Sequence, residues 1–345
     1  MIEKLKDWCP PKGWIEIHTI DVHTGGEPLR IILSGFPRLS GNTIQEKRID
    51  ARSHFDKIRK ALMWEPRGHT DMYGAIIVEP HSHDADFGVV FIHNNGYSTG
   101  CGHAVIALTK VVVETGLISK NEPITEVKMD VPSGFVRAYA ELDNGKIRSV
   151  GFQNVPSFVQ LIDHEINVPE LGILRYDLAY GGAFYVFVDV AQLGLKCDSK
   201  YLNQLIDAGM KIKESISRSV KMKHPNDPEM NFIYGTIFTG EALNRENHSR
   251  NVCIFANGQV DRSPTGTGVS ARAAIMHAKG DLKIGESITI ESIIGSTFSV
   301  KLIASTKFGN YNAVVAKVSG NAFITGSHRF WLDPDDPLQS GFLLK

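Results

Sequence analysis

Apolar residues in this chain fall into short runs separated by polar turns, with two longer exceptions. The first exception is Cys101–Thr115, which is rich in Ala, Val, Ile and Leu and ends before Gly116. The second is Thr265–Lys279, which ends before Gly280. A run of this length that stops at a glycine is typical of a largely buried helix. Ser199–Lys221 shows the periodicity of a third, amphipathic helix.

The shorter apolar runs predict strands, because turn-forming sequences bound them. Two of these turns are Pro132-Ser133-Gly134 and Asp143-Asn144-Gly145. In the first part of the chain, strands are expected at Trp14–Val22, Leu29–Leu33, Gly74–Val78, Gly88–His93, Glu126–Met129, Gly134–Leu142 and Ser149–Asn154. In the second part they are expected at Ala183–Val190, Asn231–Thr239, Asn251–Phe255, Ser287–Ser292, Thr297–Ser305 and Asn312–Val318.

The beginnings of the two apolar helices resemble each other. When Ser98–Val105 is laid over Arg262–Val269, Cys101 falls on Thr265 and Gly102 falls on Gly266, at an offset of 164 residues. Similar strand-then-helix surroundings on both sides indicate two similar halves. We expect the halves to cover residues 1–140 and 141–319, with the tail at about 320–345 packed back on the first. No low-complexity linker separates the halves, so they are expected to pack closely and form a cleft.

Composition and charge narrow the class of protein. The formal net charge is −1, from 37 Lys and Arg residues against 38 Asp and Glu. Proteins that bind nucleic acid usually carry a basic excess, so we expect no such partner. No run approaches roughly 18 uninterrupted apolar residues, and the N-terminus lacks the apolar centre of a signal peptide, so no membrane association is predicted. Four cysteines without a CxxC pair fit a reducing cytoplasm rather than a disulfide framework.

Both helix starts are suited to binding a small anion. The first turn of a helix leaves backbone N–H groups unpaired, and its dipole favours negative charge. A glycine there lets a ligand approach the backbone closely. Gly102-His103 and Gly266-Thr267 are therefore candidate cradles for a carboxylate. If the halves face each other, the N–H groups of both helix starts can bind the same carboxylate.

Cys101 is the candidate base at the first helix start. That position is expected to stabilise a thiolate and lower the pKa of the thiol. A thiolate beside a carboxylate site is suited to removing the α-proton of an amino acid, because N–H donors stabilise the charge that develops. Asp261 either accepts hydrogen bonds from a substrate ammonium or is an ordinary turn residue. His103 either contacts the substrate or caps the helix.

Other classes of site have weaker support in the sequence. Gly266–Ala271 fits the GxGxxA dinucleotide pattern, but polar Asp261–Pro264 intervenes, whereas that motif follows a strand directly. The His81–Asp86 segment holds two histidines and two aspartates, yet it is typical of a polar loop rather than a metal site.

A non-catalytic amino-acid-binding protein is an alternative class. It would use the same two helix starts to bind a carboxylate, but it would not need a thiol. A Cys101→Ser variant with full function would favour that class.

Several longer segments resemble the motifs of the proline racemase family. They are Asp21–Pro28, Pro66–Gly74, Gly96–His103, Asp261–Gly268 and Trp331–Pro337, and the likeness extends from about residue 14 to the end of the chain. The resemblance implies an α+β, diaminopimelate-epimerase-like fold, with two pseudo-symmetric halves that each wrap a mostly antiparallel sheet around a central helix. It also implies a homodimer that acts on an amino acid without metal, nucleotide or pyridoxal phosphate.

The resemblance assigns roles to individual residues. Cys101 corresponds to the cysteine that removes the α-proton of the substrate. The family's substrate contacts correspond to Gly102, His103, Asp261, Gly266 and Thr267.

The chain departs from the family's racemases and epimerases at Thr265, where they carry a second cysteine. A threonine hydroxyl is a far weaker acid than a thiol, so inversion by two bases is disfavoured. Members with this cysteine and threonine pair imply dehydration of trans-3-hydroxy-L-proline. In that reaction Cys101 takes the α-proton, the 3-hydroxyl leaves, and the product tautomerises to pyrroline-2-carboxylate. Thr265, His103 or a water could protonate the leaving group. Proline racemisation and 4-hydroxyproline 2-epimerisation are the alternatives.

Overall fold

The computed structural model describes residues 2 and 8–344, and its elements follow the same order in two halves. The first half contains β1 (Ile15–Thr24), β2 (Glu27–Ser34), α2 (Ile44–His54), α3 (Asp56–Met63), β3 (Tyr73–Val78), β4 (Phe87–His93), β5 (Gly96–Ser98), α4 (Gly102–Glu114), β6 (Ile124–Val131), β7 (Gly134–Asp143) and β8 (Lys146–Gln153). The second contains β9 (Ser157–Val168), β10 (Gly172–Tyr180), β11 (Phe184–Asp189), α5 (Leu202–Ser219), β12 (Ile233–Gly240), β13 (Ser249–Phe255), β14 (Gln259–Val260), α6 (Gly266–Lys279), β15 (Ser287–Glu291), β16 (Thr297–Phe308) and β17 (Tyr311–Gly320). The last strand is β18 (Ala322–Leu332).

Strand pairing confirms that the two halves are alike. Most neighbouring strands are antiparallel, and the parallel pairs occupy equivalent places. Strand β2 runs parallel to β3, as β11 does to β12. Likewise β4 runs parallel to β6, as β13 does to β15. In each half a helix and its flanking loops fill the crossover between the members of a parallel pair. The expected α+β fold of two similar halves is therefore confirmed.

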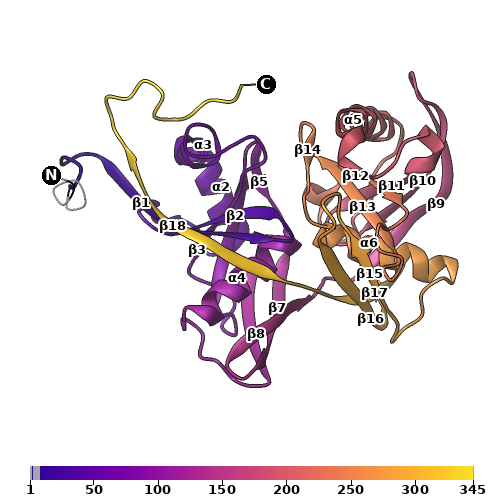
Figure 1. The fold of residues 1–345 in the computed structure, drawn as a ribbon, viewed down its shortest axis with the longest axis horizontal. Coiled ribbons are helices and arrows are strands. Elements are labelled where there is room, and N and C mark those ends of the chain that lie inside the picture. The colour runs from indigo at the N-terminus through magenta and orange to yellow at the C-terminus, as the bar shows by residue number, and fades with distance from the viewer. Residues whose placement is uncertain (1, 3–7, 345) are drawn as a thin grey trace.

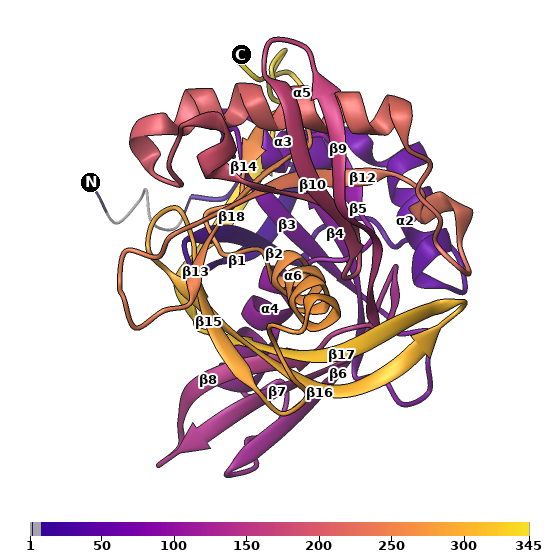
Figure 2. The same ribbon diagram turned by 90° about the vertical axis from the view of Figure 1, so that its right-hand side faces the viewer.

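The two apolar helices lie at the centres of their halves. Figure 1 shows the halves side by side, with α4 in one and α6 in the other. Figure 2 looks along the long axis and shows both helices surrounded by strands. Nearly every residue of α4 is buried, because Ala, Val, Ile and Leu occur on all sides of this helix. The predictions of helices at both positions are confirmed.

Two connections hold the halves together. Strand β8 pairs with β7 of the first half and also with β17 of the second. Strand β7 spans residue 140, so the strand pairing does not divide the chain into halves at that residue. The boundary between residues 140 and 141 therefore stays a prediction. After β17 the chain returns in β18, which pairs antiparallel along the whole of β1 (Figure 1). In the described part of the chain, no helix has the length and apolar character needed to cross a membrane.

Several elements were not predicted. They are α2, α3, the long hairpin of β9 and β10, and β18. Only three residues of α2 are buried, and β18 alternates poorly between buried and exposed positions. Such elements lack the regular spacing of apolar residues from which helices and strands are predicted.

Candidate active site

The starts of α4 and α6 meet at the interface between the halves. A Cβ atom added to Gly102 would lie 2.8 Å from the Cα of Gly266, and one added to Gly266 would lie 2.8 Å from the Cα of Gly102. Only glycine allows this approach at either position. Two helix N-termini, each with unpaired N–H groups and a favourable dipole, are thus brought to one place. This arrangement suits a single carboxylate.

Cys101 and Thr265 occupy equivalent positions immediately before the two helices. Cys101 has an extended backbone, whereas Thr265 has φ of 70°. A positive φ is costly for a β-branched residue and is characteristic of functional sites. The Thr265 side chain is 4% exposed, and its Oγ1 makes no hydrogen bond of good geometry with the described residues. It still lies near enough to Asp261 to lower the pKa of that carboxyl. The strain and the lack of a hydrogen bond of good geometry fit a residue placed for a ligand rather than for stability.

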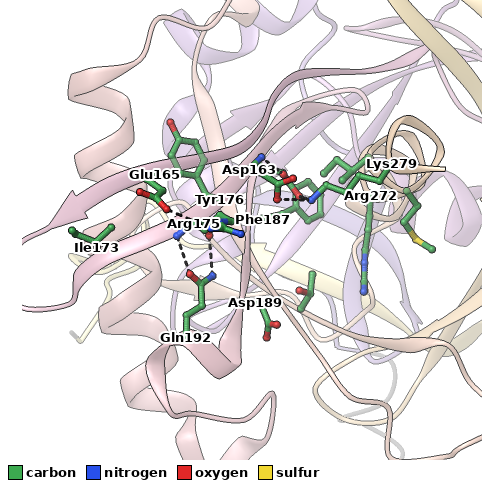
Figure 3. A pocket seen from close by; sticks show the side chains of 14 residues that line it. Asp163, Glu165, Ile173, Arg175, Tyr176, Phe187, Asp189, Gln192, Arg272 and Lys279 are labelled. Carbon is green, nitrogen blue, oxygen red and sulfur yellow. Dashed lines mark hydrogen bonds and ion pairs between the residues drawn. The ribbon is translucent and has the colours of Figure 1, made fainter. Parts of the chain in front are cut away.

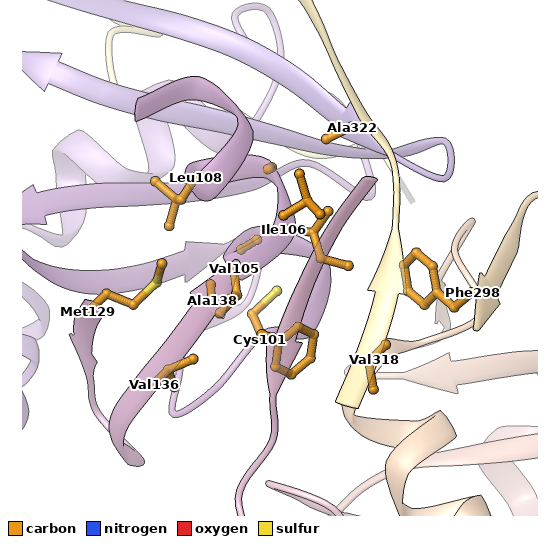
Figure 4. Packing of buried hydrophobic residues seen from close by; sticks show 14 of the residues in the cluster. Cys101, Val105, Ile106, Leu108, Met129, Val136, Ala138, Phe298, Val318 and Ala322 are labelled. Carbon is orange, nitrogen blue, oxygen red and sulfur yellow. The ribbon is translucent and has the colours of Figure 1, made fainter. Parts of the chain in front are cut away.

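Cys101 lies in an apolar setting. It is 8% exposed and belongs to the largest core cluster, as Figure 4 shows. Burial raises the pKa of the Cys101 thiol well above its usual range, and the negative charge of Asp261 raises it further. The backbone N–H of Ala104 lowers this pKa, but by less. The expectation that the helix start lowers the thiol pKa is therefore wrong, because desolvation outweighs the helix terminus.

His103 lies beside the thiol. Its Nδ1 is 3.2 Å from the Cys101 Sγ, and its backbone carbonyl accepts a hydrogen bond from Thr24 Oγ1 at 2.9 Å. Burial lowers the pKa of His103 to about 3, so the ring is neutral at physiological pH. A neutral imidazole can orient the thiol by a hydrogen bond. It does not supply a positive charge to stabilise the thiolate.

Asp261 is the buried carboxylate of the site. Its Oδ1 accepts a hydrogen bond from the backbone N–H of Ser263 at 2.8 Å, which fixes the loop before α6. Burial raises the pKa of Asp261 to about 6, while the Ser263 hydrogen bonds oppose this shift. Most of its population is therefore charged at neutral pH. The neighbouring Arg262 forms its ion pair with Asp71, so the buried Asp261 carboxylate is suited to accept a substrate ammonium.

Thr267 is held in the first turn of α6. Its Oγ1 lies 2.7 Å from the hydroxyl of Tyr185 on β11. The side chain is 8% exposed. The predicted residues Cys101, Gly102, His103, Asp261, Thr265, Gly266 and Thr267 all lie at or just before the two helix starts and are all buried.

Other residues near the thiol were not predicted from the sequence. Glu27 is fully buried and accepts the backbone N–H of Arg262 at 2.7 Å, across the interface between the halves. Burial raises the pKa of Glu27 well above its usual range, and the charge of Asp261 adds to the shift. Tyr73 and Tyr234 are close enough to Cys101 for its charge to raise the pKa of each phenol, after burial as the main cause. The sequence signal that could have identified these residues is a single carboxylate or phenol in or beside an otherwise apolar predicted strand.

A separate cavity lies in the second half. This cavity has a volume of about 540 Å³. Charged residues of β9, β10 and α6 are among those that line it, as Figure 3 shows. Its Lys279 Nζ lies 3.0 Å from Asp163 and 2.9 Å from Asp177, so these charges are already paired. The predicted site residues are not among the described residues that line it. The cavity is therefore distinct from the helix-start site.

The His81–Asp86 segment lies in the loop between β3 and β4. The side chains of His83 and Asp84 are largely exposed. Across residues 2 and 8–344, no group of three or more His, Cys, Asp or Glu residues is placed to hold a metal ion.

The fold and site together define a class of protein: two similar α+β halves that bring paired helix starts and a buried thiol to one place. The family model described as proline racemase matches residues 19–343, and the chain belongs to this family. It is 48% identical to the trans-3-hydroxy-L-proline dehydratase of Colwellia psychrerythraea, over 99% of this chain and 97% of the relative. It is 43% identical to the 3-hydroxyproline 2-epimerase of Burkholderia multivorans, over 95% of this chain and 98% of the relative.

A solved structure gives the same fold. The hydroxyproline epimerase of Agrobacterium vitis, with bound trans-4-hydroxy-L-proline, matches with a TM-score of 0.90 and 33% identity. The match covers 97% of this chain and 96% of that chain. The likeness in both sequence and fold thus extends over nearly the whole molecule.

Proposed function

We propose that this chain is a hydro-lyase that converts trans-3-hydroxy-L-proline to pyrroline-2-carboxylate, with Cys101 as its single base. The observation that carries the proposal is the pair Cys101 and Thr265 at two facing helix starts. One thiol is sufficient to remove an α-proton. A threonine opposite it cannot readily return a proton to the other face of the carbanion. The names of relatives at 43–48% identity support the same substrate class.

The site explains how the substrate is held and activated. Its carboxylate binds the N–H groups at Gly102 and Gly266, and its ammonium binds Asp261. The charge of Asp261 adds to burial in raising the pKa of the Cys101 thiol. An ammonium that neutralises Asp261 therefore removes one obstacle to thiolate formation. The base becomes available when the substrate is in place, and the N–H donors stabilise the developing carbanion.

Epimerisation is the second candidate function. A 3-hydroxyproline 2-epimerase is 43% identical to this chain, so the fold and much of the site are compatible with inversion. Inversion needs a second acid on the other face of the substrate. Thr265 occupies that position here, which favours dehydration.

A substrate panel tests the proposed function. The purified chain is incubated with trans-3-hydroxy-L-proline, trans-4-hydroxy-L-proline or L-proline, with and without EDTA, and the products are followed by NMR. We expect pyrroline-2-carboxylate from the 3-hydroxy substrate alone, at a rate that EDTA does not change. A 3-hydroxy substrate that forms no pyrroline-2-carboxylate would contradict the proposal, and inversion of any of the three substrates would support the second candidate.

The pH dependence of the reaction should report Asp261. Because burial raises its pKa to about 6, Asp261 becomes protonated and loses its hold on the ammonium as the pH falls through this value. We expect kcat/KM to fall below about pH 6 and to rise toward alkaline pH as the Cys101 thiolate forms. Asp261→Asn should raise KM and remove the acidic limb. An acidic limb that persists in this variant would assign it to another group.

We also infer a homodimer in the cytoplasm. Among residues 2 and 8–344, the pairing recorded for strand β18 is the one with β1, so we infer that its other edge can pair with a second copy. Cys101, Cys197 and Cys253 are buried thiols outside any disulfide of the described residues, which suits a reducing compartment. Light scattering on the purified chain measures the assembly, and a monomeric mass would contradict the dimer.

A further inference from the structure

Three buried polar atoms around the thiol make no hydrogen bond of good geometry with the described residues. They are Thr265 Oγ1, Tyr73 Oη and Glu27 Oε1. Buried polar groups nearly always have partners, so an unpaired group near a reactive thiol indicates a place that a ligand fills. Tyr73 is 2% exposed, and its ring lies 4.9 Å from the His103 ring and 5.5 Å from the His93 ring. The phenol is thus held firmly on the side of the site that carries Cys101.

The stereochemistry of the substrate limits where a proton donor can lie. In trans-3-hydroxy-L-proline the hydroxyl and the carboxylate are on opposite faces of the ring. The α-hydrogen lies opposite the carboxylate on the same carbon, so the hydroxyl and the α-hydrogen share one face. Cys101 must approach that face to remove the α-hydrogen. The group that protonates the departing hydroxyl must approach it too.

This requirement separates the candidate donors. Thr265 begins the facing helix, at the position that corresponds to Cys101, and so meets the opposite face of a ring held between the two helix starts. His103 is on the correct side, but its pKa of about 3 keeps the ring neutral, and a neutral imidazole is a poorer acid than a phenol. Tyr73 is on the correct side, and its buried hydroxyl makes no hydrogen bond of good geometry with the described residues.

On the basis of the proposed dehydratase function, we propose that Tyr73 is the catalytic acid that protonates the departing 3-hydroxyl. Its hydroxyl lies close enough to the Cys101 thiol for each group to affect the ionisation of the other. Burial keeps the phenol protonated, as a raised pKa indicates, so it is a donor throughout the working pH range.

The proposed step balances without any further reactant. The Cys101 thiolate takes the α-proton, and the electron pair left on C2 forms the C2–C3 double bond as the C3–O bond breaks. The departing oxygen takes the Tyr73 proton and leaves as water. The Cys101 thiol then returns its proton to the Tyr73 phenolate, which restores both groups. The enamine tautomerises to the cyclic imine.

Tyr73→Phe tests this role, because it removes only the hydroxyl. The variant is incubated with trans-3-hydroxy-L-proline in deuterated water, and elimination and α-deuterium exchange into the remaining substrate are measured in one sample. We expect elimination to fall by about 10²- to 10³-fold. The ratio of exchange to elimination should rise at least about tenfold, because the carbanion still forms but loses its hydroxyl slowly.

Controls separate the role of the hydroxyl from a loss of structure. Tyr176→Phe removes a hydroxyl from a buried tyrosine of a different core cluster and should change neither rate. Equal losses of exchange and elimination in Tyr73→Phe, or no loss of elimination, would overturn the proposal. A selective loss in Glu27→Gln with normal elimination in Tyr73→Phe would assign the acid to Glu27. A wild-type chain that forms no pyrroline-2-carboxylate would instead contradict the dehydratase function itself.

Discussion

Cys101→Ala should remove dehydration, with turnover reduced by about 10³-fold or more. Cys101 supplies the thiol at the first helix start. The imidazole of His103 beside it has a pKa lowered to about 3, so it is too weak a base to replace a thiolate. The measurement is the rate of pyrroline-2-carboxylate formation, together with α-deuterium exchange in deuterated water. Both should disappear, because both begin with removal of the α-proton.

Cys197→Ala is the matched control for this prediction. Cys197 is equally well buried, at 4% exposed, but belongs to a core cluster of the second half. Its loss should lower stability and leave turnover within a fewfold of the wild type. Near-normal activity in Cys101→Ala would show that another group is the base and would favour a binding or structural role for this thiol.

Thr265→Cys should add 2-epimerisation to the activities of the chain. The new thiol would lie opposite Cys101 and supply the second acid that inversion requires. Cysteine is not β-branched, so the positive φ of this position is less costly for it than for threonine. We expect the epimer to appear at a rate within about 100-fold of dehydration, from an undetectable level in the wild type. Chiral chromatography of the recovered substrate measures it.

Thr265→Ser is the control, because it removes the methyl group and keeps a hydroxyl. It should form no epimer. If Thr265→Cys forms none either, the shape of the pocket decides the outcome of the reaction, and the missing thiol is not sufficient to explain it.

The sequence predicted the centre of each half well. The helices that start at Gly102 and Gly266 carry long apolar runs and end at or beside glycines, which are strong local signals. The sequence also marked the first-turn glycines, Cys101 and Asp261 as candidate site residues, and their roles stay predictions. The exposed helix α2 was missed because its apolar pattern is weak. Its capping box, in which Thr43 and Glu46 bond reciprocally, was the overlooked signal.

Properties that depend on distant contacts could not be predicted. The pKa of Cys101 depends on burial in a core to which both halves contribute, and the local helix start indicated the opposite shift. Glu27 meets Arg262 only because the halves pack together. Tyr73 stands on β3, and nothing in its local sequence shows that its ring reaches His103. Such contacts follow from the tertiary fold rather than from local patterns.

The most direct test of the central claim follows wild-type enzyme and trans-3-hydroxy-L-proline over time in deuterated water. Product and remaining substrate are analysed by NMR and chiral chromatography. A one-base dehydratase forms pyrroline-2-carboxylate, while the remaining substrate keeps its L configuration even where deuterium has entered at the α-carbon. Accumulation of the 2-epimer at a rate comparable with dehydration would contradict the account, because it would require a second acid on the face that Thr265 occupies.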